Sequence, residues 1–208
     1  FYRTDKDIAL SSEIKALLPF MEKPQISKEG LSDYFNFQFC LNEKTMFDGV
    51  FRIKPANYLR ISDRLEFRQS EYWKIDGKIE QIDEDEAVEK LAETFDKTVQ
   101  AHLVGDVEVG AFLSGGLDSS GISALASKHS EQPFRVFNGR FLDYGNFDES
   151  RYARSQANHC GSYLSVLDID EAAFVENFES LICHLDQPVA GPGSFPQLMT
   201  SKLASENV

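Results

Sequence analysis

The stretch from residue 108 to residue 206 alternates between short apolar runs and longer segments with helical spacing. The apolar runs predict three strands, at Glu108–Leu113, Arg135–Gly139 and Tyr163–Leu167. The other segments predict four helices, at Leu117–His129, Glu149–Cys160, Ala172–His184 and Gly193–Glu206. Strands that alternate with helices make right-handed crossovers, which give a parallel sheet covered on both faces. The pattern therefore predicts an α/β fold with a doubly wound parallel sheet.

The first 75 residues have a different pattern, in which short extended stretches are broken by turns. Extended segments are expected at Ile8–Ser11, Asn36–Phe39, Asn57–Ile61 and Leu65–Arg68. Two short helices are also expected, over Ser12–Leu18 and Lys28–Phe35, the second with Ser27 as its N-cap. This part is therefore β-rich, and it contains no glycine-rich turn between a strand and a helix.

A polar and charged stretch, KIDGKIEQIDEDE, separates the two patterns and is typical of a linker. Asp83 and Glu86 at its end form a capping box. Five apolar residues then recur at three- and four-residue steps and predict a helix with one buried face: Val88, Leu91, Phe95, Val99 and Leu103. The expected organisation is a first domain over 1–75, a linker over 76–86 and an α/β domain over 87–208.

The segment FLSGGLDSSGISALA joins the first predicted strand of the sheet to its helix. Gly115 and Gly116 permit positive φ and let a phosphate approach the main chain. The amides of this turn lie at the positive end of the helix dipole, where each nearby anionic charge is stabilised by about 0.3–1 kcal/mol. Neither GxxxxGK[ST] nor GxGxxG is present, so the turn suits a pyrophosphate better than a γ-phosphate or a dinucleotide. A tight turn with a serine cap is the alternative.

The net charge of −13, from 34 acidic and 21 basic residues, argues against a nucleic-acid partner, whose phosphates need a basic face. Cys40, Cys160 and Cys183 form no CxxC pair, which favours reduced thiols in the cytoplasm. The four histidines lack zinc-ligand spacing, and no metal site made by protein side chains alone is expected. No apolar run approaches the ~20 residues that span a bilayer, so no membrane partner is expected. The chain is predicted to be cytoplasmic.

The motif SGGLDSS after an apolar strand resembles the pyrophosphate-binding loop of the N-type ATP pyrophosphatases. Further segments narrow the resemblance to one branch: SEIKALL, TMFDGVFRIKPANYL, DQPVAGPGSFPQ and SKLASENV. Nearly the whole chain resembles the glutamine-dependent asparagine synthetases, which are class II amidotransferases. The resemblance implies that residues 1–75 are the C-terminal part of an Ntn-type glutaminase domain. Residues 87–208 would then be the N-terminal part of a synthetase domain with an adenine nucleotide α-hydrolase-like fold.

Such synthetases activate the side-chain carboxylate of aspartate by attack on the α-phosphate of ATP, which yields β-aspartyl-AMP and pyrophosphate. Ammonia from glutamine, passed through a tunnel from the other domain, then displaces AMP. The resemblance implies ATP and Mg²⁺ as cofactors, small-molecule substrates (ATP, aspartate, glutamine or ammonia), and a homodimer as one possible assembly. It also implies a pyrophosphate site made by Ser114, Gly115, Gly116, Leu117, Asp118, Ser119 and Ser120, and an adenine site bordered by Leu113, Val136, Phe137 and Asn138.

Several of the candidate residues also suit an ordinary structural role. Asp118 could bind metal through water or brace the loop amides, and it could equally be a first-turn aspartate favoured by the helix dipole. Leu113 could equally be sheet core. Asp148 and Glu149 precede a helix, so capping is favoured over contact with Mg²⁺ or substrate. Asp186 is expected at the same sheet end, as a wall of the site or as a plain turn residue.

Some positions depart from the family pattern. Residue 1 is Phe where the family has a nucleophilic N-terminal cysteine, and the family's second ATP-site motif, an acidic SGxGGDE-like loop, would begin just past Val208. We therefore expect an internal piece of a longer enzyme, with the catalytic residues outside this chain. Gln187 stands where many relatives have glutamate, and Ala56 replaces the glycine of a Pro-Gly-x-x-Leu segment.

Two other functions fit the same residues. The first is a related amidotransferase or a β-lactam-synthetase-like enzyme that acts on another carboxylate, because nothing after residue 114 names the acid. The second is an ATP-binding module without turnover, which the intact SGGLDSS disfavours.

Overall fold

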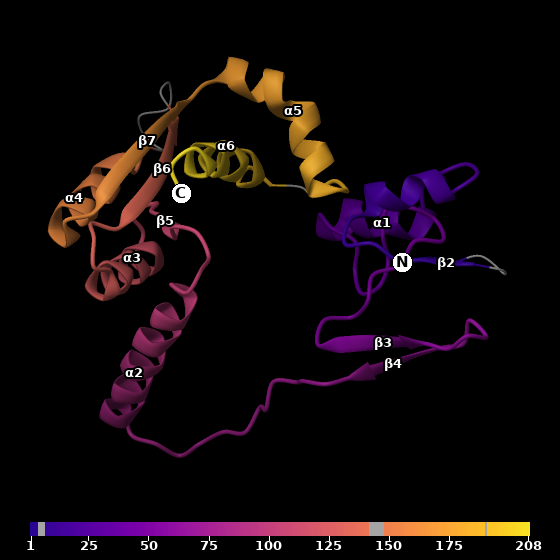
Figure 1. Cartoon of the computed structure of the whole chain (residues 1–208), viewed down its shortest axis with the longest axis horizontal. Helices are drawn as coiled ribbons and strands as arrows, with labels where there is room; N and C mark the ends of the chain where they lie inside the picture. The colour runs from indigo at the N-terminus through magenta and orange to yellow at the C-terminus, as the bar shows by residue number, and fades with distance from the viewer. Residues whose placement is uncertain (4–6, 142–147, 190) are drawn as a thin grey trace. The chain divides into compact units, whose positions relative to one another are not determined.

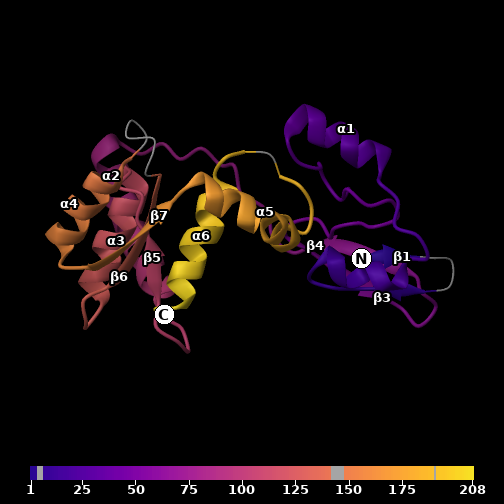
Figure 2. The same cartoon turned by 90° about the horizontal axis from the view of Figure 1, so that it is seen from above.

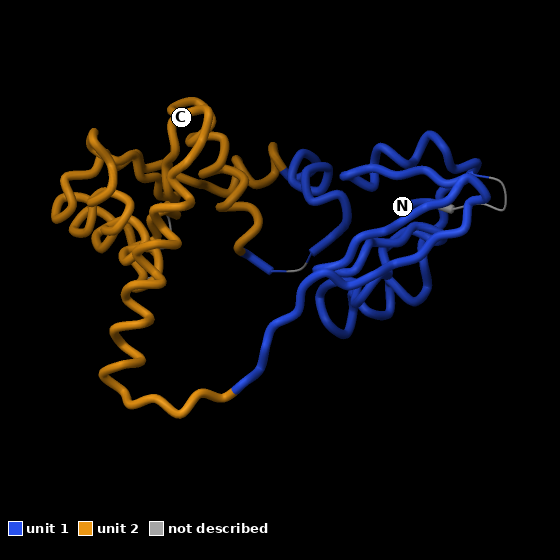
Figure 3. Tube along the Cα trace, turned by 60° about the horizontal axis from the view of Figure 1, so that its bottom comes forward, with its two compact units in different colours: residues 1–78, 178–192 blue, residues 79–177, 193–208 orange. Residues whose placement is uncertain are grey.

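The computed structural model describes the chain except for residues 4–6, 142–147 and 190. The chain forms two compact units (Figure 3). Unit 1 contains residues 1–78 and 178–192, and unit 2 contains residues 79–177 and 193–208. Helix α5 (Glu171–Leu185) therefore begins in unit 2 and ends in unit 1.

Unit 2 is built on a three-stranded parallel sheet in the order β5-β6-β7 (Figure 1). Helices α3 and α4 lie on one face of the sheet and α6 lies on the other (Figures 1 and 2), while α2 packs against α3. The elements are α2 (Glu84–His102), β5 (Gly110–Phe112), α3 (Leu117–His129), β6 (Arg135–Phe141), α4 (Ser150–Cys160), β7 (Tyr163–Ile169) and α6 (Ser194–Ser205). The predicted α/β fold with a parallel sheet is confirmed.

The core of unit 2 lies between the sheet and helices α3 and α4. Its buried members are Val99, Leu113, Ala126, Phe134, Val136, Ala153 and Ala157. Small residues on the two helices let them approach the sheet closely. Burial of each larger apolar side chain stabilises the folded state by roughly 1.5–3 kcal/mol. This packing fixes the ends of β5 and β6 relative to the starts of α3 and α4.

The apolar stripe of α2 is buried only near the C-terminal end of the helix. Val99 is 6% exposed, whereas Val88 and Leu91 are 59% and 70% exposed and Phe95 is 37% exposed. The prediction of a stripe buried along its full length is therefore wrong. The contacts with α3 that can be located on α2 are made by Phe95 and Asp96, in the second half of the helix. The predicted cap is confirmed, since the Asp83 carboxylate accepts a hydrogen bond from the Glu86 amide at 2.8 Å.

Unit 1 contains two antiparallel strand pairs, β1 with β2 and β3 with β4. Its core is formed by Leu17, Met21 and Val50. The elements are β1 (Tyr2–Arg3), β2 (Ile8–Ala9), the 3₁₀ helix η1 (Ile14–Phe20), α1 (Lys28–Phe37), β3 (Asn57–Ile61) and β4 (Phe67–Glu71). None of the described helices combines the length and the apolar character needed to cross a membrane.

Two local predictions in unit 1 are wrong. The expected extended segment Asn36–Phe39 is instead the end of α1, which runs to Phe37 and is closed by Gln38 at φ 70°. The strand expected at Leu65–Arg68 begins later, because Leu65 has a φ of 60° and belongs to the turn. Ser27 does cap α1, accepting a hydrogen bond from the Gly30 amide at 3.1 Å.

Candidate functional site

Residues 113–116 connect β5 to α3. The Ser114 hydroxyl lies 2.9 Å from the Ser119 hydroxyl and accepts a hydrogen bond from the Gly116 amide at 3.2 Å. Gly116 is the N-cap residue of α3, so no side chain of its own caps the helix. The two serines therefore brace the turn without closing the end of the helix.

The first amides of α3 are left open. Within the described residues, the amides of Gly115, Leu117, Asp118 and Ser119 find no acceptor, and the first bond of the helix joins the Ser120 amide to the Gly116 carbonyl at 3.0 Å. Leu117 is 89% exposed, so this end of the helix faces solvent. Free amides at the positive end of a helix dipole form an anion-binding arrangement.

The two glycines of the turn have different roles. Gly115 has a φ of +93°, and a Cβ added there would lie 2.7 Å from the Cβ of Tyr152 and 2.8 Å from the amide nitrogen of Ala153. Only glycine fits, because the turn rests directly on the first turn of α4. A Cβ on Gly116 would meet only the Ser114 hydroxyl, at 3.4 Å, which is an ordinary contact.

A cavity of about 270 Å³ lies at the carboxyl end of β5 and beside the central residues of β6, next to this turn. It is lined by Phe112, Leu113, Ser114, Phe137, Asn138, Gly139, Pro196, Gln197 and Thr200. Three residues predicted to border adenine therefore share a cavity with the first residue of the predicted pyrophosphate loop. The fourth, Val136, is fully buried in the core and does not line the cavity.

Asn138 is the most unusual wall residue. Its side chain is buried, and its Nδ2 donates a hydrogen bond to the Leu113 carbonyl at 2.8 Å. Its Oδ1 has no hydrogen-bond partner among the described residues. Leu113 is buried as well, and its amide donates to the Phe137 carbonyl at 2.8 Å. Leu113, just after β5, is thus hydrogen-bonded to the middle of β6, and the buried Asn138 Oδ1 is unsatisfied within the described residues.

Three wall residues come from α6, and none of them was predicted as a site residue. Pro196, Gln197 and Thr200 are separated by one and three residues, a spacing that puts them on one helical face. Thr200 is buried, and its hydroxyl donates to the Pro196 carbonyl at 2.7 Å. The helix was predicted over Gly193–Glu206, but nothing in the sequence indicated which of its residues would pack against β6.

Asp148 acts as a cap. Its carboxylate accepts a hydrogen bond from the Ser150 amide at 2.9 Å, at the start of α4. Hydrogen bonds from Ser150 lower the pKa of Asp148, and the nearby charges of Arg140 and Arg154 lower it further. Glu149, the N-cap residue by position, makes no side-chain capping bond. The loop that precedes this pair, over 142–147, lies outside the described residues.

Arg140 and Asp168 form an ion pair between β6 and β7, where they are register partners. The guanidinium donates to both carboxylate oxygens, with a distance of 3.2 Å for the Nη2 bond. This hydrogen bonding lowers the pKa of Asp168 and raises the pKa of Arg140. The carboxyl ends of the strands thus carry fixed charge near the α4 cap.

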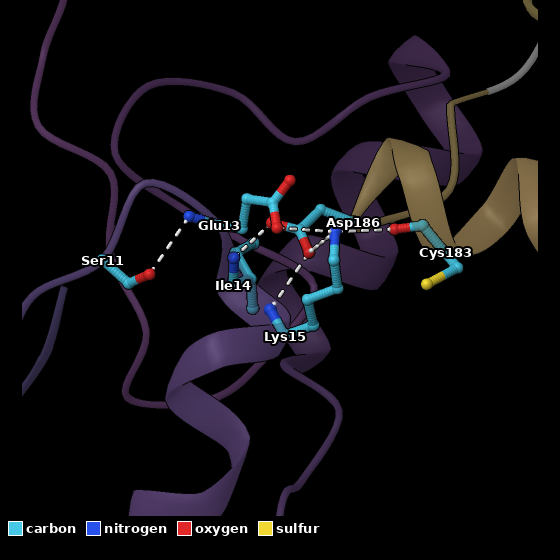
Figure 4. Close-up of polar contacts among 6 residues, drawn as sticks. All are labelled: Ser11, Glu13, Ile14, Lys15, Cys183 and Asp186. Carbon is cyan, nitrogen blue, oxygen red and sulfur yellow. Dashed lines mark hydrogen bonds and ion pairs between the residues drawn. The ribbon is translucent and has the colours of Figure 1, made fainter. Parts of the chain in front are cut away.

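Asp186 lies in unit 1, although it was expected beside the sheet of unit 2. Its carboxylate accepts hydrogen bonds from the amides of Ile14 and Lys15, the second at 3.0 Å (Figure 4). The neighbouring Gln187 accepts from the Met46 amide at 3.0 Å through its Oε1. The two residues are therefore engaged by unit 1 itself.

Comparison with known families accounts for both parts of the chain. The model of the asparagine synthase family matches residues 90–208, and that of the glutamine amidotransferase domain matches residues 1–73. Because the first match covers more than half of the chain, the chain belongs to the asparagine synthase family.

Curated relatives agree with this assignment. Asparagine synthetase [glutamine-hydrolyzing] 1 of Bacillus subtilis is 29% identical over 209 residues, which cover 100% of this chain and 33% of that protein. A putative asparagine synthetase [glutamine-hydrolyzing] of Mycobacterium tuberculosis is 30% identical, over 96% of this chain and 32% of that protein. The protein named amidase chry2, from Gibberella zeae, is 27% identical over 88% of this chain and 29% of that protein. The chain spans about a third of the length of these relatives.

Proposed function

We propose that the chain is part of a glutamine-dependent enzyme that consumes ATP and converts aspartate to asparagine. In this proposal, residues 1–75 are the C-terminal part of an Ntn-type glutaminase domain, and residues 76–86 are a linker. Residues 87–208 are the N-terminal part of a synthetase domain with a doubly wound, adenine nucleotide α-hydrolase-like fold. The two family matches and the helices on both faces of the sheet support this division.

The uncapped start of α3 carries the proposal. We assign the pyrophosphate of ATP to Ser114, Gly115, Gly116, Leu117, Asp118, Ser119 and Ser120. Formation of β-aspartyl-AMP displaces pyrophosphate, so the protein must stabilise charge on the leaving group more than it must react covalently. Open amides at a helix start are preorganised for this, because they require no reorientation when the charge develops. AMP leaves in the second step, when ammonia attacks the acyl group.

The adenine is assigned to the cavity beside the turn. Leu113, Phe137 and Asn138 line it, and Val136 supports it from the core. Apolar side chains with a few fixed polar groups are typical of a nucleotide pocket. The unsatisfied Oδ1 of Asn138 is consistent with a polar ligand at this wall.

Mg²⁺, when bound, would neutralise charge on phosphate oxygens. Asp118 is the carboxylate that belongs to the loop itself, and it stands in the first turn of α3 among the open amides. It fits a metal contact through water. Asp148 and Glu149 remain predicted contacts, although the Asp148 carboxylate already accepts a hydrogen bond from the main chain. Asp186 was the third predicted contact, but its carboxylate is occupied by the amides of Ile14 and Lys15, so we do not assign it to Mg²⁺ or substrate. The cytoplasmic location and the possible homodimer also remain predictions.

Calorimetric titration of Mg-ATP and pyrophosphate into the protein at its full natural length tests the ATP site. Replacing Ser114 and Ser119 by Ala should weaken binding by about tenfold, because two hydroxyls that hold the turn are lost. A second serine pair, Ser127 and Ser162, has hydroxyls 2.8 Å apart and lies outside the turn. The double variant Ser127→Ala/Ser162→Ala is therefore the matched control. Equal affinity in all three proteins would contradict the assignment.

An assay of amide formation from ammonia and different carboxylic acids tests whether aspartate is the substrate. We expect AMP, pyrophosphate and asparagine in equal amounts when aspartate is supplied. Turnover with a different carboxylic acid alone would indicate a related amidotransferase or a β-lactam-synthetase-like enzyme. Binding of ATP with no turnover on any acid would indicate a non-catalytic ATP-binding module.

A further inference from the structure

The segment that follows α5 is held on unit 1 through main-chain amides. Asp186 accepts from Ile14 and Lys15, and Gln187 accepts from Met46 (Figure 4 shows the Asp186 contacts). The partners are separated by 171 residues in the bond to Lys15 and by 141 in the bond to Met46. The contacts therefore tie a late part of the chain to two early parts.

The backbone of Asp186 prepares its side chain for this contact. Its φ of 67° is left-handed, and its amide donates to the Ile182 carbonyl at 3.1 Å, which closes the end of α5. Aspartate tolerates this conformation better than most residues. One residue thus ends α5 with its backbone and binds the start of η1 with its side chain.

The start of η1 depends on this outside partner. Glu13, the N-cap residue of η1, makes no capping hydrogen bond with its side chain. The Asp186 carboxylate takes that place and binds the first two amides of η1. Because its side chain is only 16% exposed, these charge-assisted hydrogen bonds face little competition from water.

Lys15 adds a second set of contacts to the same segment. Its Nζ lies 3.5 Å from the Asp186 carboxylate and 3.0 Å from the Glu13 carboxylate, and it donates to the Cys183 carbonyl at 3.0 Å. A lysine at the last turn of α5 also complements the negative end of that helix dipole. The residues Lys15, Asp186 and Gln187, with the amides they meet, are called the α5 anchor below.

The α5 anchor joins parts that match two different families. Residues 178–192 fall within the stretch matched by asparagine synthase, yet they fold into the unit that contains residues 1–78. The stretch matched by the glutamine amidotransferase domain, residues 1–73, lies in that same unit. The anchored segment is thus a noncovalent link between the two matched stretches, in addition to the chain between them.

We propose that Asp186 is a positioning residue for the transfer of ammonia, needed when the nitrogen comes from glutamine and not when free ammonia is supplied. This inference rests on the proposed function. Ammonia released by glutamine hydrolysis is lost to water unless the releasing and accepting parts stay joined while it passes. Free ammonia reaches the acyl-AMP from solution and does not need that connection.

The variant Asp186→Gly removes the carboxylate and keeps a residue that suits positive φ. The control is Asn42→Gly, in the same unit, because Asn42 has a φ of 52° and its side chain is outside the α5 anchor. Both proteins are made at full natural length. The measurement is the number of glutamates released per amide formed, together with the amide-forming rate on free ammonia.

We expect Asp186→Gly to raise the glutamate released per amide by about fivefold, a typical size for coupling between sites. The rate with ammonia should stay within about twofold of wild type, which also shows that the protein is folded. Asn42→Gly should change neither quantity. The conservative variant Asp186→Asn keeps one acceptor oxygen and should fall between wild type and Asp186→Gly.

An unchanged glutamate ratio in Asp186→Gly would overturn the inference, and so would an equal loss of both activities. Failure of the wild type to form any amide from ammonia would instead overturn the proposed function. Hydrogen exchange tests the α5 anchor without any activity. The amides of Ile14 and Lys15 should exchange faster in Asp186→Gly than in wild type, and equal exchange would show that the anchor does not form.

Discussion

Of the turns in this molecule that use a left-handed residue, two make a useful comparison, because one has a glycine there and the other has an alanine. Gly115 in unit 2 has a φ of 93°, and Ala56 in unit 1 has a φ of 56°. Ala56 is half-buried beside the β3–β4 hairpin, where its carbonyl accepts from the Tyr72 amide at 2.9 Å. A Cβ at Gly115 would instead collide with the backbone and side chain of α4.

This comparison shows that a position can require glycine for two reasons, its backbone conformation and the lack of space for a side chain. A left-handed conformation costs an L-residue about 1–2 kcal/mol, which a folded protein can tolerate, as it does at Ala56. Contact with another backbone at 2.8 Å cannot be tolerated without movement of that element. Gly115 is therefore fixed by packing as well as by φ, and it fixes the proposed pyrophosphate turn against α4.

The largest expected effect is that of Gly115→Ala. It should lower the free energy of unfolding by about 3 kcal/mol, from the left-handed strain plus the overpacking against Tyr152 and Ala153. Chemical denaturation measures it. The matched variant Gly116→Ala should lower it by less than about 1 kcal/mol, since its Cβ finds room. Equal losses at both positions would remove the distinction between the two glycines.

The reverse change at the other turn should stabilise the protein. Ala56→Gly relieves the left-handed strain and should raise the free energy of unfolding by about 1 kcal/mol, reduced somewhat by the greater freedom of glycine when unfolded. Ala56→Val should act in the opposite direction because of its branched Cβ. Thermal denaturation compares the three. A loss of stability in Ala56→Gly would mean that the turn is not strained.

A smaller effect is expected from the support beneath Gly115. Asp148→Ala removes the carboxylate that accepts from Ser150 and should lower the melting temperature by a few degrees, because α4 loses its cap. Glu149→Ala is the control, since Glu149 makes no side-chain capping bond. If the two variants melt together, the cap does not stabilise α4.

The smallest effect is a pH dependence confined to the Gly115 side. The pKa of Asp148 in the folded protein lies below its ordinary value of 3.8, so its contribution is complete above that value and is lost as the pH falls through the lowered pKa. NMR shifts of Ser150 and Gly115 should follow this titration, whereas those of Ala56 should not. The same titration in Asp148→Asn should be flat at all three residues.

The sequence predicted the local parts of the site well. Helix α3 begins at Leu117 and ends at His129 as expected, because a glycine turn and a short apolar stretch determine it locally. Strands β6 and β7 were also located from their apolar runs, although each extends two residues further. Contacts between neighbours in sequence were thus accessible to prediction.

Features that depend on contacts between residues far apart in the sequence could not be predicted. Val88 and Leu91 are exposed, although their helical spacing predicted a buried face. The engagement of Asp186 by Ile14 and Lys15 spans more than 170 residues. The Pro and Gly residues around Asp186 predicted a turn, which we expected beside the sheet. Turn composition, however, contains no information about which surface the turn contacts.

The α5 anchor affects which amino-acid substitutions can be tolerated at the positions it contacts. Asp186 and Gln187 recognise peptide N–H groups, which every amino acid except proline supplies, so positions 14 and 46 can change identity without loosening the attachment. We therefore expect no correlated substitutions between these positions in related sequences, so covariation would not detect this link. Only a proline on the receiving side would reveal it.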